Sequence, residues 1–468
     1  MHSAFRSVAV ALGCLTLAGQ SAARQSPVPA APPADGGTVQ QQMDDMRREM
    51  ERVLRDNAAM RGEIDQLRAE ADDQWLTEKR SNEIKTLVND VLADADTRAS
   101  LLQSGMTAGW NEHFFLSSGD GRFLLMLEGL EQIRFIWNHH DEPDRWRYGF
   151  ENARTQLTFR GHVFNDDIEY LVRGEFARSG GNETLLDAWA RYRFTDKVSL
   201  RFGQFKLPYS REFLVSEGQQ LAVERTMVSD FLSAKRSQGI ELEYLDSVNR
   251  WSGAFSDTTG GTLGGASTNT VWSAQDTEWS VTSRYERLIA GSWEQFSDFT
   301  SPRGDEFGLL LGLGAFGQQG ESTGSFTTTR DENRVFGATV DISAEWGGAN
   351  LFASAYYVYF DSDLAGVGIV DFLGLTAQGG WYLDPKWEVF GRIEYLASQS
   401  NEFETPNLLV GTVGVNYYID GHDVKWTTDV SVGFNEISGT YASDIAGFRG
   451  DTTGNPQFVF RTQFQLMF

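Results

Sequence analysis

Residues 456–468, PQFVFRTQFQLMF, alternate between an apolar and a largely polar face with a period of two. One face carries Phe458, Phe460, Phe464, Leu466 and Phe468, and the other carries Val459, Arg461, Gln463, Gln465 and Met467. This period predicts a β-strand with two unlike faces. A half-buried strand of a soluble protein has the same pattern. A chain that ends on an aromatic strand is more typical of a membrane β-barrel, whose last strand closes the sheet against lipid.

The composition of the chain agrees with a barrel. Among 468 residues, aromatic content is 13% and there are 48 Gly but only 10 Pro, which favours many strands with aromatic girdles and Gly-bearing bends. Mean hydropathy is −0.35, as expected when only every second strand residue meets lipid. The formal net charge of −25 argues against nucleic acid as a partner.

The N-terminal segment has the features of an export signal. Residues 1–23 combine Arg6, an apolar run and the small residues 21–23, and residues 24–37 are a Pro/Ala-rich spacer that we expect to be disordered. A membrane anchor is the alternative, but the run is shorter than the roughly 20 residues needed to span. Cys14 lies in a poor lipidation motif, and after cleavage the chain has no thiol for disulfides, catalysis or metal binding.

Residues 38–73 follow heptad spacing without a break. The a positions are Met43, Met50, Asn57, Ile64 and Ala71, and the d positions are Val39, Met46, Val53, Met60 and Leu67. This pattern predicts a parallel coiled coil, with Asn57 fixing its register, although a lone amphipathic helix is the alternative. A buried Asn is common in dimers, whereas barrels of this size are often trimers. Residues 81–103 predict a second amphipathic helix.

Sixteen strands are predicted from residue 129 onward. They span 129–138, 151–163, 167–178, 184–194, 197–207, 236–246, 249–257, 277–286, 305–317, 333–346, 349–361, 370–383, 386–396, 407–419, 422–435 and 456–468. Short and long connections alternate, as in a barrel with periplasmic turns and external loops, and an even count places both ends in the periplasm. Residues 287–304 form a long link where the alternation requires a short turn, so a miscounted strand is the alternative. A soluble β-sandwich would share the alternation.

Residues 185–225, LLDAWARYRFTDKVSLRFGQFKLPYSREFLVSEGQQLAVER, resemble the phosphate-selective porin O and P family, as do residues 111–135, NEHFFLSSGDGRFLLMLEGLEQIRF. The terminal Phe also resembles the end signal of bacterial outer-membrane proteins. The resemblance covers residues 109–468 and implies a sixteen-stranded, usually trimeric porin in the outer membrane. The coiled coil and residues 90–105 look like planctomycete-type members of the family.

Alternation assigns a set of basic residues to the lumen of the first five strands: Arg134, Arg154, Arg160, Arg173, Arg191, Arg193 and Arg201. Seven guanidiniums on one arc would form an anion-binding track, because Arg binds phosphate and carboxylate with two donors. Acids interleave with them, at Glu169, Glu175, Asp187, Glu241 and Glu243. The alternative is that these Arg side chains are neutralised wall residues that join strands by salt bridges.

The longest link, residues 208–235, is the third external loop and carries apolar residues that need a place to pack. They are Phe213, Leu214, Leu221, Val223, Phe231 and Leu232. Insertion into the lumen would supply that place. The charged residues of the constriction would then be Glu212, Glu217, Glu224, Arg225, Lys235 and Arg236. In the family, basic residues here help to bind anions, whereas this loop mixes acids and bases.

The sequence specifies neither catalysis nor a cofactor. It holds no GxSxG, HExxH or P-loop motif, and His139-His140 before Asp141 and Glu142 is better explained as a solvated loop than as a cation site. We therefore expect a passive channel, with outer-membrane lipid as its surroundings and small hydrophilic solutes or anions as its cargo, and no enzyme activity. The competing hypothesis is a structural anchor whose coiled coil binds cell wall or partner subunits.

Overall fold

The computed structural model describes residues 39–74, 85–86, 105–111, 113–140, 146–260, 262–264, 272, 276–321, 332–363, 367–400, 402, 405–450 and 455–468. The chain divides into two compact units, Met1–Asp94 and Ala95–Phe468, and each is described by itself. The predicted signal, the spacer and, apart from residues 85–86, the predicted helix 81–103 lie outside the described residues.

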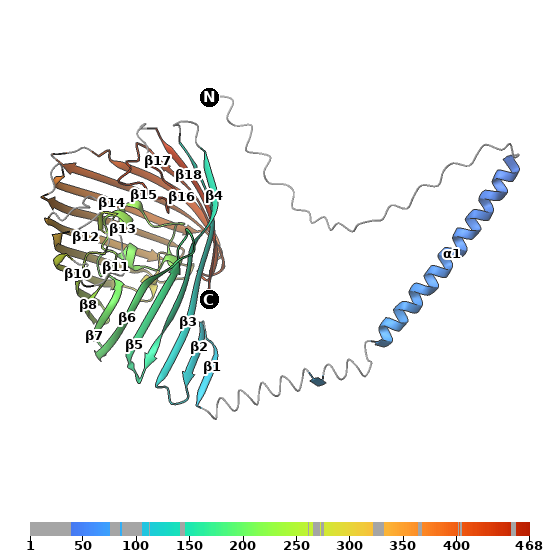
Figure 1. Cartoon of the computed structure of the whole chain (residues 1–468), viewed down its shortest axis with the longest axis horizontal. Helices are drawn as coiled ribbons and strands as arrows, with labels where there is room; N and C mark the ends of the chain where they lie inside the picture. Colours follow the sequence, from blue (N-terminus) through green and yellow to red (C-terminus); the bar gives the residue numbers. More distant parts are fainter. Residues whose placement is uncertain are drawn as a thin grey trace. The chain divides into compact units, whose positions relative to one another are not determined.

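The first unit contains one long helix, α1 (Val39–Gln74), where the heptad pattern predicts one (Figure 1). The heptad side chains between residues 43 and 64 are exposed in the single chain, including those of Met43, Met50, Asn57 and Ile64. An apolar stripe that a lone helix leaves in water is the surface that a coiled coil buries. The coiled coil itself stays a prediction. Within the described ranges, no helix is both long and apolar enough to cross a membrane.

The second unit is a β-barrel preceded by a short hairpin. The hairpin consists of β1 (Met106–Asn111) and β2 (His113–Ser118). The barrel strands are β3 (Phe123–His139), β4 (Arg147–Val163), β5 (Asn165–Phe176), β6 (Glu183–Thr195), β7 (Val198–Lys206), β8 (Arg236–Leu245), β9 (Asn249–Ser256), β10 (Thr277–Ala290), β11 (Gly308–Glu321), β12 (Glu332–Trp346), β13 (Ala349–Ser362), β14 (Gly368–Tyr382), β15 (Trp387–Ser400), β16 (Leu408–Asp420), β17 (Val424–Gly433) and β18 (Gln457–Met467).

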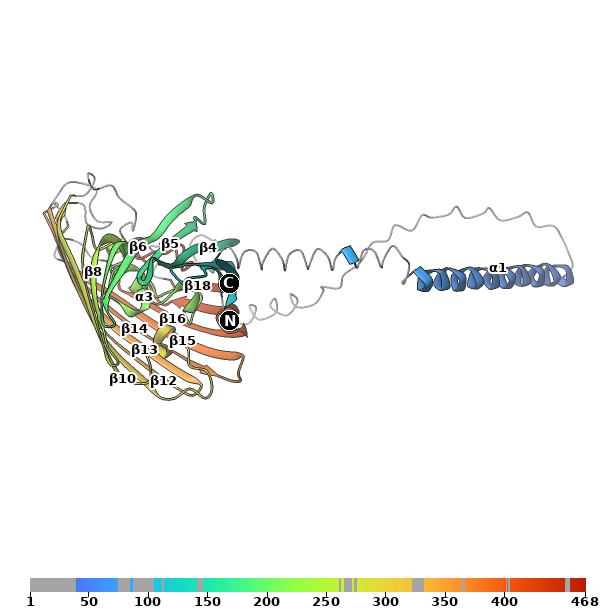
Figure 2. The ribbon, with the colours of Figure 1, turned by 90° about the horizontal axis from the view of Figure 1, so that it is seen from below.

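Each barrel strand pairs antiparallel with the next in sequence, and β18 pairs with β3 to close the ring (Figures 1 and 2). The closing register runs from Phe458 opposite His139 to Met467 opposite Leu130. The last residue continues the ladder, since Gly129 N donates to Phe468 O at 2.7 Å and Phe468 N donates to Gly129 O at 3.2 Å. All sixteen predicted strands are present, and the stretch 456–468 closes the barrel as its pattern predicts.

The first barrel strand is longer than predicted, because it begins at Phe123 rather than at residue 129. Since β18 stops opposite Leu130, the start of β3 has a free edge, and β2 occupies that edge with Phe114 opposite Leu127. The sequence count missed the β1–β2 hairpin, whose six-residue strands are too short to show a clear period.

The two faces of the wall differ as the alternation predicts. On β14, Val370, Phe372 and Thr376 are buried inside, whereas Leu373, Leu375 and Trp381 are exposed outside. The same alternation recurs along β10, β12, β13 and β15, so the outer surface carries a belt of apolar side chains. A closed barrel with such a belt satisfies every backbone group inside lipid.

The suspicion of a miscounted strand at 287–304 is wrong. Strand β10 continues to Ala290 and β11 begins at Gly308, and between them lies a true link that includes the 3-10 helix η4 (Gln295–Ser297). Phe296, Phe299, Thr300 and Ser301 in this link are buried. A connection at the short-turn end of the barrel therefore folds inward instead of crossing directly to the next strand.

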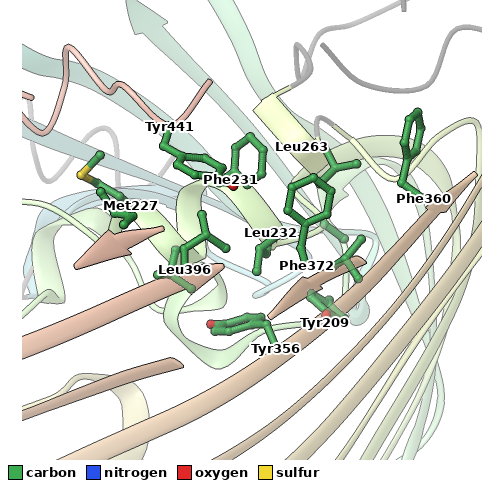
Figure 3. Close-up of a cluster of buried hydrophobic side chains, with 14 of the residues drawn as sticks. Tyr209, Met227, Phe231, Leu232, Leu263, Tyr356, Phe360, Phe372, Leu396 and Tyr441 are labelled. Carbon is green, nitrogen blue, oxygen red and sulfur yellow. The ribbon is translucent and has the colours of Figure 1, made fainter. Parts of the chain in front are cut away.

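The main apolar core lies inside the barrel rather than between layers. Figure 3 shows Phe231 and Leu232 from a long link packed against Phe372 and Leu396 of the wall, with Tyr441 from another link beside them. The Phe231 ring meets the Phe372 and Tyr441 rings edge-on, at centroid distances of 5.5 and 5.2 Å. Part of the lumen is therefore filled with packed side chains.

Candidate solute pathway

Residues 207–235, between β7 and β8, form an inserted segment inside the barrel. It contains α3 (Arg211–Leu214), the 3-10 helix η1 (Glu217–Gln219) and α4 (Met227–Leu232), and Figure 2 shows α3 within the ring of strands. The hydroxyl of Thr226 caps α4 by accepting from Ser229 N at 3.0 Å. Every residue of the segment is buried except Leu214, Ser216, Gln219, Asp230 and Lys235, which are half-buried. The apolar residues that the sequence marked as needing a partner find it here.

The inserted segment reaches the wall opposite its own strands. In a closed ring of sixteen, β15 and β16 lie across from β7 and β8, and side chains there bind the segment's backbone. The Asn416 amide donates to Leu221 O at 2.9 Å, and Arg392 donates to Glu224 O at 2.6 Å. From the neighbouring strand β17, Lys425 donates to Gln220 O at 2.8 Å. The segment thus spans the lumen and is held at both sides.

Glu224 of the inserted segment is the partner of the first two predicted wall arginines. Arg134 donates to its carboxylate at 3.0 Å, and Arg154 binds both carboxylate oxygens. Arg134 also pairs with Glu151. Although burial raises the pKa of Glu224, Arg154 and Arg134 outweigh it and lower that pKa to about 2. These two guanidiniums therefore hold the segment instead of lining an open path.

Glu217 gathers two further predicted residues, Arg225 and Arg236, together with Lys206, which the sequence analysis did not single out. Arg225 lies 3.1 Å from its carboxylate, Lys206 lies 3.5 Å away and Arg236 lies 3.7 Å away. The three cations also lie over the Phe213 ring. Burial raises the pKa of Glu217, but the surrounding cations lower it well below its usual range. The carboxylate stays ionised and neutralises part of this basic cluster.

The remaining predicted residues are also paired with acids. Arg160 pairs with Glu128, Arg173 with Asp187, both Arg191 and Arg193 with Glu169, Arg201 with Glu241 and Lys235 with Asp230. Glu212 is buried and accepts from Thr226 N at 2.7 Å, so it stabilises the inserted segment from within. Each predicted cation thus has a carboxylate neighbour, which leaves a basic arc whose charge is largely balanced.

The two sides of the barrel interior differ in burial. On β5, neither face has a buried residue, and on β6 only Asp187 is buried. On β13 through β17, by contrast, almost every inward side chain is buried under the inserted segment and its apolar cluster. A cavity of about 370 Å³ lies between the segment's Ser216 and Gln219 and the wall at Arg160 and Arg173. The least buried part of the wall is therefore at β5 and β6, in the middle of the arc of strands β3–β8.

The sequence reasoning missed a set of buried charged residues: Arg211 of the inserted segment, and, on the other strands, Arg284, Asp341, Arg392, Glu394, Asp429 and Arg461. Arg461 donates to Asp429 at 2.7 and 3.1 Å, and Arg284 donates to Asp341 at 2.8 and 2.9 Å. Alternation could have predicted that the strand residues of this set face the lumen, because each lies an even number of positions from inward-facing residues of its own strand. Which acid each Arg meets depends on register.

His139 and His140 lie beside an aromatic and a basic side chain, respectively. His139 stacks on Trp137 with 5.9 Å between ring centroids, and His140 lies 3.3 Å from Arg449, while Asp141 and Glu142 lie outside the described residues. Across the described ranges, no three His, Cys, Asp or Glu side chains come together in a way that could hold a metal ion.

Comparison with known proteins identifies the family. Residues 139–468 match the phosphate-selective porin O and P family. An uncharacterized protein of Aquifex aeolicus (strain VF5) is 26% identical over 303 residues, which is 59% of this chain and 70% of that protein. An anion-selective porin from Comamonas acidovorans shares the fold with a TM-score of 0.54 and 12% identity, covering 74% of this chain and 99% of that one. The chain belongs to the phosphate-selective porin O and P family and is an outer-membrane porin.

Proposed function

We propose that solutes diffuse passively along the β3–β8 arc and that the channel prefers small anions over cations of similar size. The observation that carries this proposal is the relative exposure of the ion-paired side chains. Arg160 is 43% exposed against 20% for Glu128, and Arg193 is 39% exposed against 27% for Glu169. At these two pairs the guanidinium is more exposed than the carboxylate that balances it, so a solute passing them meets positive charge first.

The preference is expected to be weak. A site that traps phosphate needs several donors left free for the ligand, whereas these cations already donate to carboxylates. Mixed acids and bases in the inserted segment favour a path that repels cations mildly and releases anions readily. The Comamonas relative of this fold is named anion-selective, which agrees with the direction of the proposal.

The assembly we propose is a trimer joined in part by α1. The exposed heptad side chains support a parallel coiled coil between copies, and the even number of barrel strands supports a periplasmic position for it. In this arrangement Met43, Met50, Asn57 and Ile64 face the neighbouring helices.

The reversal potential of the purified protein in a planar bilayer under a KCl gradient tests the function. An anion-selective potential that grows when phosphate replaces chloride supports the proposal. A cation-selective potential would contradict it. Liposome swelling with small sugars tests the competing anchor hypothesis, because a sealed barrel gives no swelling.

Replacing Arg191, Arg193 and Arg201 together by Gln tests the arc itself. We expect anion preference to fall, because three half-buried guanidiniums on β6 and β7 are lost while the acids remain. The matched control replaces Arg287 and Arg334, which lie on the outward-facing side of β10 and β12, by Gln. A change in the control in proportion to its two lost charges, against three in the test variant, would mean that total charge, not the arc, sets the selectivity.

A further inference from the structure

The link 291–307, between β10 and β11, is the one connection at the short-turn end that departs from the rule of tight turns. It is anchored to the barrel rim on both sides. The Trp293 indole donates to Asp246 O at 2.9 Å, and Arg303 donates to Tyr382 O at 2.9 Å. Gly348 N donates to Pro302 O at 3.1 Å. The link is therefore fixed to the rim and can hold another segment of the chain in position.

The inserted segment is clamped to this link through Arg211. The Arg211 guanidinium donates to Phe296 O at 2.7 Å and to Asp298 O at 2.8 Å. It also lies over the rings of Phe296 and Phe299, 5.5 and 5.1 Å from their centroids. A planar guanidinium that binds two carbonyls and stacks on two rings fixes both position and orientation, which a Lys side chain cannot do.

Arg211 is a buried cation among other charged groups. Burial lowers the pKa of Arg211, and the carboxylates of Glu286, Asp341 and Glu345 oppose that shift. Arg284 adds to the lowering and itself pairs with Glu286 and Asp341. Arg284 also donates to Tyr209 O at 2.8 Å, two residues before Arg211 in the segment. Buried carboxylates on β10 and β12 therefore favour a cation at this point of the segment.

A second connection joins the link to the middle of the inserted segment. Asp298 lies 3.3 Å from His422, whose other ring nitrogen lies 3.2 Å from Lys425 Nζ, and Lys425 donates to Gln220 O at 2.8 Å. Phe299 packs in one buried cluster with Val215 and Leu221 of the segment. Two loops that enter from opposite ends of the barrel thus meet inside it.

We infer that the link 291–307, acting through Arg211, sets the size limit of the pore by fixing how far the inserted segment stands from the β3–β8 arc. This inference rests on the proposed path along that arc. The width of the opening depends on the position of the segment, and Arg211 fixes the segment near its start while Glu224 fixes it further along. Arg211 is a positioning residue, because it lies behind the segment and acts on the opening through it.

The test is single-channel conductance together with the largest sugar that swells liposomes, measured on the full chain. Replacing Arg211 by Gln removes the clamp, and we expect conductance to rise by roughly twofold and larger sugars to enter. Arg211→Lys keeps the charge but not the two-pronged geometry, so its conductance should lie between the two. The matched control is Arg122→Gln, which removes an Arg–carbonyl contact with Phe164 O that involves neither the link nor the inserted segment.

The outcomes separate the inference from the proposed function. Unchanged conductance and size limit in Arg211→Gln would overturn the inference, as would an equal increase in Arg122→Gln. If Arg211→Gln does not fold, Phe299→Ala replaces it, with a larger pore in support and an unchanged pore against. A wild-type protein that conducts cations would contradict the anion preference but leave the size test intact. If the wild-type protein does not conduct and the Arg211→Gln variant does, the result would support the clamp and contradict passive diffusion through the wild-type protein.

Discussion

The β3–β8 wall and the β13–β17 wall of the barrel have the same alternation but opposite interiors. On β5 both faces are partly exposed, and the inward Arg173 and Glu169 meet solvent-accessible space. On β14 the inward Val370 and Phe372 are fully buried under the inserted segment. The difference shows that the strand pattern specifies a wall, whereas the segment that folds against the wall decides whether solutes can reach it.

The same chemical pair therefore has a different energetic role on the two sides. Arg461 and Asp429 are both fully buried, and Arg461 also donates to Ser431 and to Ala446 O, each at 2.9 Å. Arg193 and Glu169 remain accessible to water. Removing one member of a dry pair leaves an uncompensated charge, while an accessible pair exchanges its partner for water.

The largest expected effect follows from this contrast. Arg461→Gln should lower the free energy of unfolding by roughly 3–5 kcal/mol, because Asp429 would stay buried without its cation. Arg193→Gln should lower it by roughly 0–1 kcal/mol. Urea unfolding of the protein refolded in lipid vesicles measures both. Equal losses of unfolding free energy would show that water reaches the Arg461–Asp429 pair as easily as the Arg193–Glu169 pair.

Apolar packing gives a second, smaller contrast within one strand. Phe372 faces the lumen and is 1% exposed, whereas its neighbour Leu373 faces outward and is 45% exposed. Phe372→Ala should cost about 3 kcal/mol, because it leaves a cavity between β14 and the Phe231 ring. Leu373→Ala should cost clearly less, since lipid fills the space. The same vesicle unfolding measurement applies, and a larger loss at Leu373 would argue against a packed lumen.

Local signals explain why the fold could be predicted. A two-residue period and turn residues such as Gly347-Gly348 depend only on neighbours in sequence, so all sixteen strands were found. The insertion of residues 208–235 was also predictable, because apolar residues such as Phe231 need a packing partner. The hairpin β1–β2 was missed, since it exists only because β18 leaves the edge of β3 free.

The sealed side was not predicted, although the sequence carries a signal for it. Residues 351–360, LFASAYYVYF, are apolar at inward as well as outward positions, and Phe352, Tyr356, Val358 and Phe360 are all buried inside. Strands that are buried on both faces have such nearly continuous apolar runs. The acid partner of each Arg could not be predicted, because it depends on register and on the long link that reaches it.

Low pH should weaken the contact between the inserted segment and the barrel wall at Arg134 and Arg154. The folded pKa of Glu224 is about 2, below its ordinary value of 4.5, so its ion pairs with Arg134 and Arg154 stabilise the inserted position fully above pH 4.5. That stabilisation is lost as pH falls from 4.5 toward 2. We therefore expect conductance to be constant at neutral pH and to rise in this acidic window as the segment loosens.

The variant Glu224→Gln separates this residue from the other carboxylates. It should show raised conductance already at neutral pH and a smaller further increase on acidification. The matched control, Glu151→Gln, removes the other partner of Arg134 but leaves the segment's own carboxylate in place. An acid response that persists unchanged in Glu224→Gln would assign the effect to other groups.

Changes in α1 are expected to have the smallest effect on conductance and on the stability of the barrel. Deleting residues 38–73 should lower the temperature at which the oligomer separates on semi-native gels, while conductance and barrel unfolding stay unchanged, because in the proposed coiled coil the heptad side chains pack on other copies. Met50→Glu with Ile64→Glu, at a positions, should have the same effect as the deletion. Arg48→Gln with Arg55→Gln changes the opposite face of α1 and serves as the control. An oligomer that is equally stable in all variants would mean that α1 has another role, and that contacts between the lipid-facing walls alone hold the copies together.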